Sequence, residues 1–184
     1  FFDQFQYDDI TVEHLLRHNS GLPADLFYCP RDQSSDVLKG VLATKLEYET
    51  GKKTVYSDLG MILLGKIIEK VSGRSLDQFT REEIFLPLNM LETKYGINDN
   101  EKNRTASTEL FKGKYVHGEV HDEKAFHLNG VSGSAGIFST ARDISKFTDV
   151  CLNPETQSII NPNLLKKSHE DYNDQRGLSF QVWD

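Results

Sequence analysis

One long, largely apolar segment, residues 59–71, constrains the fold of this chain more than any other part of its sequence. Its apolar side chains are spread almost around the whole circumference of a helix, which predicts a central helix that is covered on most sides. Ser57 is placed to cap the start of this helix, and Gly73 stands where a left-handed residue commonly ends one. The polar turn Tyr56-Ser57-Asp58 directly precedes the helix. A polar turn beside a buried helix is difficult to fold, which indicates that the turn has a use.

Most of the remaining sequence also has the signals of helices. Further helices are predicted to begin near Thr11, Ser35, Ser75, Thr140 and Asn161. Ser75 with Gln78 has the spacing of a capping box. Residues 98–124 are polar and aperiodic, which indicates a long surface excursion, and only residues 178–183 alternate like a strand. We therefore expect a mainly α-helical chain with at most one or two short strands.

The composition limits the kinds of partner that the chain can have. Its 184 residues carry a formal net charge of −7. Nucleic acid is not expected as a partner, because phosphate binding requires clustered Lys and Arg side chains. The longest uninterrupted apolar stretch, residues 61–64, is far too short to span a bilayer, so no transmembrane segment is expected.

Three segments together resemble the serine β-lactamase and penicillin-binding-protein family, in its class C-like branch with the related esterases. They are residues 10–23 (ITVEHLLRHNSGLP), the Tyr56-Ser57-Asp58 turn with its helix, and residues 130–143 (GVSGSAGIFSTARD). The family fold is an α+β arrangement in which a helical lobe is inserted beside an antiparallel sheet, with the active site between them. The resemblance implies that residues 1–184 are a single fragment of this fold, comprising the helical lobe and, near residues 178–183, the start of a sheet strand.

The resemblance also implies a catalytic role for Tyr56. In the family, the tyrosine of a Tyr-x-Asn motif relays the proton from the nucleophilic serine to the leaving group. An ordinary phenol is a poor base because its pKa is about 10, so this role requires nearby cations that favour the phenolate. Spacing alone favours a tyrosine that packs its ring before a helix, whereas the flanking matches favour the catalytic role.

Asp58 departs from the asparagine that is commoner in the family, and we expect it to be the second catalytic residue. An ionised carboxylate only accepts hydrogen bonds, whereas an amide also donates them. Asp58 could hold a catalytic lysine through its charge, but it could donate to a substrate carbonyl only when protonated. This weakens the case for β-lactam or peptide substrates and leaves simple ester hydrolysis open. Stabilisation of the first helical turn is a second, compatible role for Asp58.

Ser57, His121, Asp122 and Ser134 are the candidate substrate contacts. A Val-His-Asp-Glu segment recurs ahead of the Gly-rich loop in the resembled branch, so the resemblance places His121 and Asp122 at the edge of the cleft. Residues 130–136 do not form a Gly-x-Ser-x-Gly nucleophile elbow, because Ser134 occupies the final glycine position. We expect this segment to form a tight turn that shapes one wall of the pocket.

Two motifs of the family are not found in the sequence. No serine is followed by a lysine three positions later, and neither Lys-Thr-Gly nor His-Thr-Gly occurs. The oxyanion hole of the family, a large term in acyl transfer, also comes from segments outside this chain. We therefore expect this fragment to be inactive alone. The longer protein is expected to be a serine hydrolase that acts on a β-lactam, D-peptide or ester through an acyl-enzyme, without a cofactor or metal.

Two alternatives stay open at this point. A non-catalytic binding or regulatory domain could keep the β-lactamase-like fold without its chemistry, and Asp58 is the best support for this reading. A metallohydrolase could use His117 and His121, which have the spacing of zinc ligands on a helix, although their polar, Gly-containing loop argues against a rigid helix. The same spacing of His14 and His18 is already accounted for by the family match.

The resemblance also bears on location and assembly. Family members commonly act outside the cytoplasmic membrane, which implies an extracytoplasmic or cell-envelope protein whose substrate is a small acyl compound. A helical lobe separated from its sheet would expose apolar surface and could self-associate.

Overall fold

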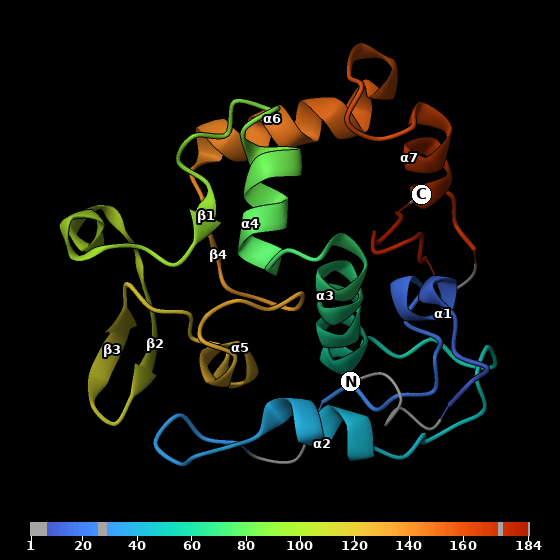
Figure 1. The fold of residues 1–184 in the computed structure, drawn as a ribbon, viewed down its shortest axis with the longest axis horizontal. Helices are drawn as coiled ribbons and strands as arrows, with labels where there is room; N and C mark the ends of the chain where they lie inside the picture. The colour runs from blue at the N-terminus through green and yellow to red at the C-terminus, as the bar shows by residue number, and fades with distance from the viewer. Residues whose placement is uncertain (1–6, 26–28, 173–174, 184) are drawn as a thin grey trace.

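The computed structural model describes residues 7–25, 29–172 and 175–183. These residues form a mainly helical structure with a few short strands, which confirms the predicted fold class (Figure 1). The α-helices are α1 (Val12–Leu16), α2 (Val37–Ala43), α3 (Asp58–Ser72), α4 (Leu76–Thr80), α5 (Glu123–His127), α6 (Ala141–Leu152) and α7 (Pro162–Ser168). A π-helical turn, η2 (Arg81–Phe85), continues α4, and two 3-10 helices are η3 (Asp99–Arg104) and η4 (Pro154–Thr156).

Helix α3 is the central helix that the sequence predicts. The Ser57 hydroxyl accepts a hydrogen bond from Gly60 N at its start, and Gly73 ends it in the left-handed conformation. Its first turns pack into the main core, which comprises Leu15, Leu22, Val37, Val41, Leu42, Leu59, Ile62 and Leu63. Figure 1 accordingly shows α1 and α2 beside the N-terminal half of α3. The last turn is uncovered, since Val71 is 82% exposed.

The helix caps agree with the sequence in some places and differ in others. Thr140 and Asn161 cap α6 and α7 as expected, through Asp143 N (3.3 Å) and Asn163 N (2.9 Å). The predicted capping box at Ser75 is wrong, because the Ser75 side chain makes no cap hydrogen bond. The carboxylate of Glu69 in α3 instead accepts from Leu76 N at 3.1 Å. A group from a neighbouring helix therefore replaces the local cap.

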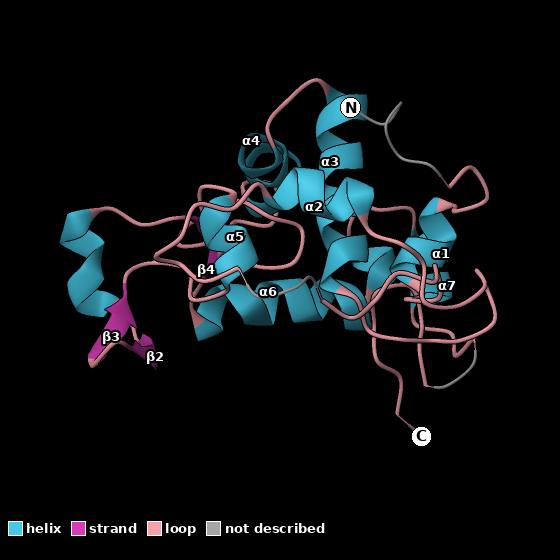
Figure 2. Ribbon diagram, turned by 90° about the horizontal axis from the view of Figure 1, so that it is seen from below, coloured by secondary structure: helices cyan, strands magenta, loops and turns pink. Residues whose placement is uncertain are grey.

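The strands form two small antiparallel pairs. β1 (Lys94–Tyr95) pairs with β4 (Ile137–Phe138), and β2 (Ser107–Phe111) forms a hairpin with β3 (Lys114–His117). The described residues thus contain four short strands, more than the expected one or two. The polar excursion over residues 98–124 consists of η3 and this hairpin, which protrude together at one end of the molecule (Figure 2).

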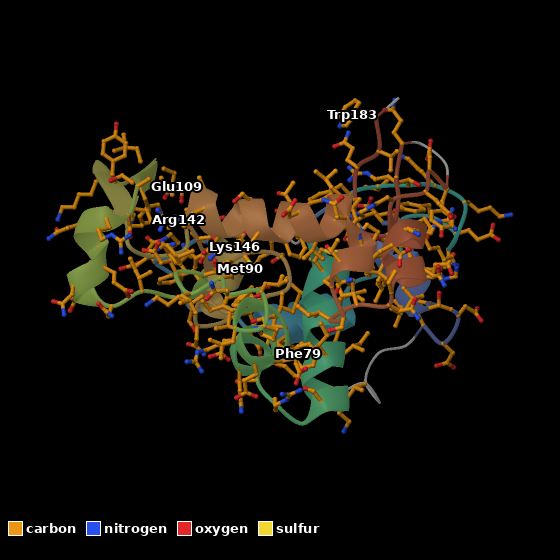
Figure 3. All side chains as sticks on the ribbon, turned by 90° about the horizontal axis from the view of Figure 1, so that it is seen from above. Phe79, Met90, Glu109, Arg142, Lys146 and Trp183 are labelled. Carbon is orange, nitrogen blue, oxygen red and sulfur yellow. The ribbon has the colours of Figure 1, made fainter. Side chains whose placement is uncertain are left out.

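The expected strand at residues 178–183 is not formed. A single bridge joins Arg176 and Gln181, so the segment turns back on itself. Its backbone N–H groups find acceptors on helix ends, with Leu178 N donating to Ser168 O and Ser179 N to Leu16 O, at 2.9 and 2.8 Å. These bonds satisfy the backbone in place of a strand ladder. Beyond the turn, Trp183 extends from the ribbon and is largely exposed (Figure 3).

A buried carboxylate ties α6 to the segment before β1. Asp143 accepts hydrogen bonds from Glu92 N (2.8 Å) and Thr93 Oγ1 (3.0 Å), and it pairs with Lys146 Nζ at 2.8 Å. Figure 3 shows Lys146 between α6 and the chain near Met90.

Among the described helices, none combines the length and the apolar character that crossing a bilayer requires.

The loop over residues 130–136 touches α3 backbone to backbone. A Cβ atom at Gly65 would lie 3.0 Å from Gly133 N, and one at Gly133 would lie 2.1 Å from Met61 O. Only glycine fits at these two positions without movement of the backbone. The contact fixes the Gly-rich loop against the side of the central helix.

This contact yields a first prediction. Gly65→Ala should lower the free energy of unfolding by about 1–3 kcal/mol, because the added methyl must push the Gly133 backbone away. Gly60→Ala is the matched control in the same helix, since its Cβ would meet Leu15 Cδ2 at an ordinary 3.6 Å. It should leave stability unchanged or raise it by up to about 1 kcal/mol through helix propensity. Urea denaturation measures both, and equal effects of the two variants would contradict the packing argument.

Candidate functional site

The Tyr56-Ser57-Asp58 turn is held against residues 18–24, the segment that follows α1. Four hydrogen bonds join them: Val55 N to His18 O (2.8 Å), Ser57 N to His18 Nδ1 (3.0 Å), Ser57 Oγ to Pro23 O (2.6 Å) and Asp58 N to Ala24 O (3.1 Å). Three of the four donors are backbone N–H groups, of Val55 just before the turn and of Ser57 and Asp58 at the start of α3. Both the conformation of the turn and the position of the helix start are thereby fixed.

His18 is the buried anchor of this contact. Its side chain is 3% exposed, and its backbone is in the left-handed region with φ of 56°. Because Nδ1 accepts from Ser57 N, the ring is the neutral tautomer protonated at Nε2. Burial, assisted by the positive charge of Arg176, lowers the pKa of His18 to about 4. The histidine is thus an uncharged acceptor at neutral pH.

Tyr56 lies at the surface with its ring held in place. The ring stacks on His18 with centroids 4.6 Å apart, and the Arg176 guanidinium lies 5.6 Å from the Tyr56 centroid. The side chain is nonetheless 52% exposed. Burial and the nearby Asp58 raise the pKa of Tyr56, although Arg176 and Lys124 act in the opposite direction. With these neighbours alone, the phenol keeps its proton at neutral pH.

Asp58 belongs to a cluster of acids around one buried lysine. Lys124 Nζ lies 2.9 Å from Asp25, 3.4 Å from Asp58 and 3.5 Å from Asp122. Lys124 is only 3% exposed, and burial by itself would favour the neutral amine. The three carboxylates outweigh that effect and raise the pKa of Lys124, so the ammonium is charged. Burial and the other acids raise the pKa of Asp58, against the effect of Lys124.

The expected site residues are brought together only in part. Tyr56, Asp58 and Asp122 lie around Lys124, and Asp122 also caps α5 by accepting from Ala125 N at 2.7 Å. Ser57 is 1% exposed, and its hydroxyl is engaged with Pro23 O and Gly60 N. This position makes Ser57 a support of the turn and does not present it to a substrate.

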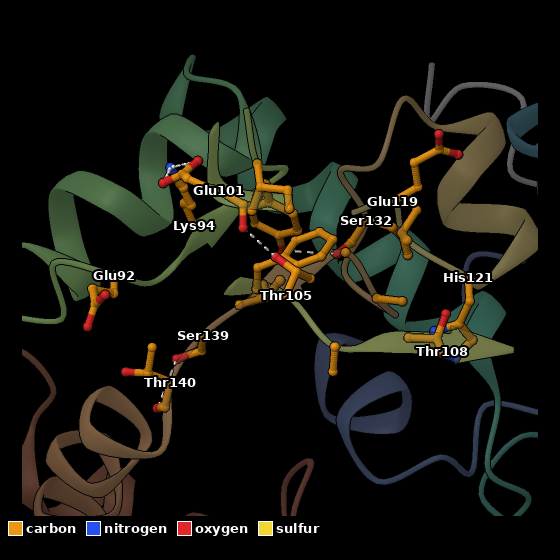
Figure 4. A pocket seen from close by; sticks show the side chains of 18 of the residues that line it. Glu92, Lys94, Glu101, Thr105, Thr108, Glu119, His121, Ser132, Ser139 and Thr140 are labelled. Atoms are coloured by element: carbon orange, nitrogen blue, oxygen red, sulfur yellow. Dashed lines mark hydrogen bonds and ion pairs between the residues drawn. The ribbon is translucent and has the colours of Figure 1, made fainter. Parts of the chain in front are cut away.

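His121 and Ser134 instead line a cavity of about 770 Å³ beside β1 and β4 (Figure 4). One wall is the Gly-rich loop, in which the Ser132 and Ser134 hydroxyls lie 2.9 Å apart. Tyr95 OH donates to Ser132 O at 2.9 Å and closes the loop against β1. The lining of the cavity mixes apolar side chains with polar ones, among them Lys94 and Glu101, whose ion pair is visible in Figure 4.

The histidines of the metal hypothesis do not converge. The His117 ring lies 2.9 Å from Thr105 O at the base of the β2–β3 hairpin, whereas His121 lines the cavity. Over residues 7–25, 29–172 and 175–183, no three His, Cys, Asp or Glu side chains are grouped so that they could hold a metal ion.

Sequence reasoning did not find Lys124, Asp25 or Arg176. Lys124 stands in a polar stretch where a single lysine has no distinguishing pattern, and its partners are far away in the sequence. Arg176 reaches Tyr56 from the turn that replaced the expected strand. The adjacency of Lys124 to the Val-His-Asp-Glu segment was the one available signal.

A family model described as "Beta-lactamase" matches residues 1–179. Among curated relatives, the chain is 38% identical to an "N-acetylmuramyl-L-alanine amidase" of Bacillus subtilis (strain 168), over 79% of this chain and 38% of the relative. It is 33% identical to a "Putative D-alanyl-D-alanine carboxypeptidase" of Escherichia coli (strain K12), over 78% of this chain and 39% of the relative. The chain thus spans about two fifths of the length of these relatives.

Solved structures agree at the level of the fold. A class C β-lactamase carrying a tyrosine-to-phenylalanine substitution superposes with a TM-score of 0.71 at 20% identity, covering 97% of this chain and 50% of that one. The octameric penicillin-binding protein homologue from Pyrococcus abyssi gives a TM-score of 0.69 at 23% identity, covering 92% of this chain and 42% of that one.

The low pKa of His18 yields a second prediction. Between pH 6.5 and about pH 4 the unfolded chain takes up a proton at this residue and the folded chain does not, so stability falls as the pH falls through this window. The contribution is at most about 1.4 kcal/mol per pH unit. His18→Asn should remove it, because Asn Oδ1 can accept from Ser57 N without titrating and asparagine tolerates a positive φ.

Urea denaturation of both proteins from pH 4 to pH 7 measures this difference. His18→Ala is the control that also loses the acceptor, and it should be less stable than His18→Asn at every pH. Equal pH slopes for the native protein and His18→Asn would show that His18 is not held neutral.

Proposed function

Because this chain belongs to the β-lactamase family of serine hydrolases, we propose that it is the helical lobe of an enzyme that hydrolyses a small acyl compound through an acyl-serine intermediate. The nucleophilic serine and its lysine would come from the part of the protein that corresponds to the remaining length of the relatives. This chain contains no Ser-x-x-Lys motif and would be inactive alone.

The observation that carries this proposal is the presentation of Tyr56. Its ring is fixed on His18 at the start of a buried helix, while the side chain stays half exposed. A proton relay needs such a fixed, accessible phenol. In the proposed reaction the serine hydroxyl attacks the substrate carbonyl, its proton passes through Tyr56 to the leaving group, and water then hydrolyses the acyl-enzyme.

The charges around Tyr56 specify what the other lobe must supply. Burial and Asp58 raise the pKa of the phenol, so the surroundings of Tyr56 in this chain do not make it a base. An additional cation near the hydroxyl would stabilise the phenolate, each pKa unit corresponding to about 1.4 kcal/mol. The lysine of a Ser-x-x-Lys motif, which the family resemblance implies, is the natural source of this charge.

The names of the relatives favour a substrate from the cell wall. One is named as an N-acetylmuramyl-L-alanine amidase and another as a putative D-alanyl-D-alanine carboxypeptidase. A D-alanyl peptide or a related amide is therefore the first substrate class to test, with a simple ester as the second because Asp58 can only accept when ionised. Such a substrate would place the enzyme outside the cytoplasmic membrane.

One observation favours a second function, a non-catalytic binding domain with the same fold. The carboxylate of Asp58, which would hold the catalytic lysine, is already paired with Lys124. Acylation of the full-length protein by a fluorescent penicillin distinguishes the two functions. A labelled serine supports the hydrolase, and saturable binding without covalent label supports the binding domain.

The hydrolase proposal gives a third prediction. In the full-length protein, Tyr56→Phe should lower kcat for a chromogenic ester and for a D-alanyl dipeptide by about 10²- to 10⁴-fold, since it removes the group that moves the proton. Stability should hardly change, because the ring and its stacking on His18 remain. Tyr115→Phe, at an exposed phenol on β3, is the matched control and should retain full activity. Full activity of Tyr56→Phe would refute the assigned role.

A further inference from the structure

Lys124 connects three parts of the chain at a single buried ammonium. Asp25 directly follows the segment that holds the Tyr56 turn, Asp58 is the first residue of α3, and Asp122 caps α5. All three carboxylates lie within 3.5 Å of Lys124 Nζ. The Lys124 ammonium therefore links α5 to the start of α3 and to Asp25.

The charge balance of the cluster makes the lysine indispensable to it. Three carboxylates and one ammonium leave two net negative charges beside Tyr56. Without the ammonium there would be three, at least two of them largely removed from water, and the carboxylates would repel one another. Asp58 would then move away from its partners or become protonated, and the carboxylate beside Tyr56 would lose its fixed position.

We propose that Lys124 is a positioning residue for the Tyr56 proton relay, which holds Asp58 in place through their ion pair. The inference rests on the proposed hydrolase function. It also accounts for the aspartate that replaces the commoner asparagine: a carboxylate at position 58 can be kept beside Tyr56 because a buried cation faces it. Lys124 itself is covered by protein and does not contact the substrate.

The effect of Lys124 on Tyr56 has a definite sign. The charged and titratable groups that face the phenol are His18, Arg176, Asp58, Asp122 and Lys124. Those near Lys124 also include Cys29 and Glu123. Removing the ammonium disfavours the phenolate, so the acidic limb of the pH profile of kcat/KM should move to higher pH.

The test uses the full-length protein with Lys124→Met, which keeps an apolar side chain of similar length. We expect kcat/KM for the chromogenic ester at pH 7 to fall at least tenfold and the acidic limb to move up by about one pH unit. The ultraviolet titration of Tyr56, isolated by subtracting the matching Tyr56→Phe protein, should move in the same direction. In an Asp58→Asn background, Lys124→Met should cost less than threefold.

Lys146→Met is the matched control. It removes another lysine paired with a buried carboxylate, Asp143, but on α6. It should lower stability and leave both the pH limb and the Tyr56 titration unchanged. If Lys124→Met behaves in the same way, Lys124 has only a structural role and the inference is overturned.

Misfolding of Lys124→Met and failure of the proposed function can each be distinguished from failure of the inference. If Lys124→Met does not fold, the proteins with Asp58→Asn alone and with Asp58→Asn plus Lys124→Met give the same comparison with one buried carboxylate fewer. The Lys124–Asp58 ion pair is absent in this background, so removing the lysine should change kcat/KM at pH 7 by less than threefold, and a loss of tenfold or more overturns the inference. Full activity of Tyr56→Phe, in contrast, refutes the proposed function, whereas the titration still measures the effect of Lys124 on the phenol.

Discussion

The contact between residues 18–24 and the start of α3 determines where everything else in the candidate site lies. Two of its four hydrogen bonds satisfy the N–H groups of Ser57 and Asp58, which have no acceptor within α3. The contact works only with a neutral imidazole, because a protonated His18 would have no lone pair at Nδ1 to accept from Ser57 N. The depth of the central helix, the exposure of Tyr56 and the assembly of the Lys124 cluster all follow from this one arrangement.

The turn lies between two buried titratable side chains, His18 and Lys124, which have opposite charge states: His18 is neutral and Lys124 is charged. On the His18 side, burial suppresses the charge and leaves a neutral acceptor. On the Lys124 side, three acids preserve the charge of a lysine that burial would otherwise neutralise. Tyr56 lies between these two environments. Its ring stacks on His18, and the charges of the Lys124 cluster and of Arg176 act on its pKa. A phenol in this position is sensitive to any cation near it, which is the property that the proposed proton relay requires.

The sequence predicts the helices wherever the signal is local. Ser57, Thr140 and Asn161 act as caps because their side chains reach N–H groups only two or three residues away. It fails where a distant group competes: Glu69 replaces Ser75 as the cap of α4. The alternating residues 178–183 fail for the same reason, since acceptors at the ends of α1 and α7 satisfy a turn. A local sequence pattern does not contain information about hydrogen-bond partners that come from distant segments of the chain.

The same division runs through the candidate site. A motif predicts Tyr56 and Asp58 as candidates because it fixes their spacing, but it does not say which of its side chains face inward, and Ser57 is the buried one. Lys124 could not be found, since Asp25 and Asp58 are about a hundred and about seventy residues away from it in the sequence. The sequence nonetheless shows a carboxylate, Asp58, at a position where an amide is common, and the ion pair with Lys124 explains how this carboxylate is accommodated. A buried charge persists only if an opposite charge accompanies it, so an unexpected aspartate beside a buried helix is itself a reason to search for a lysine.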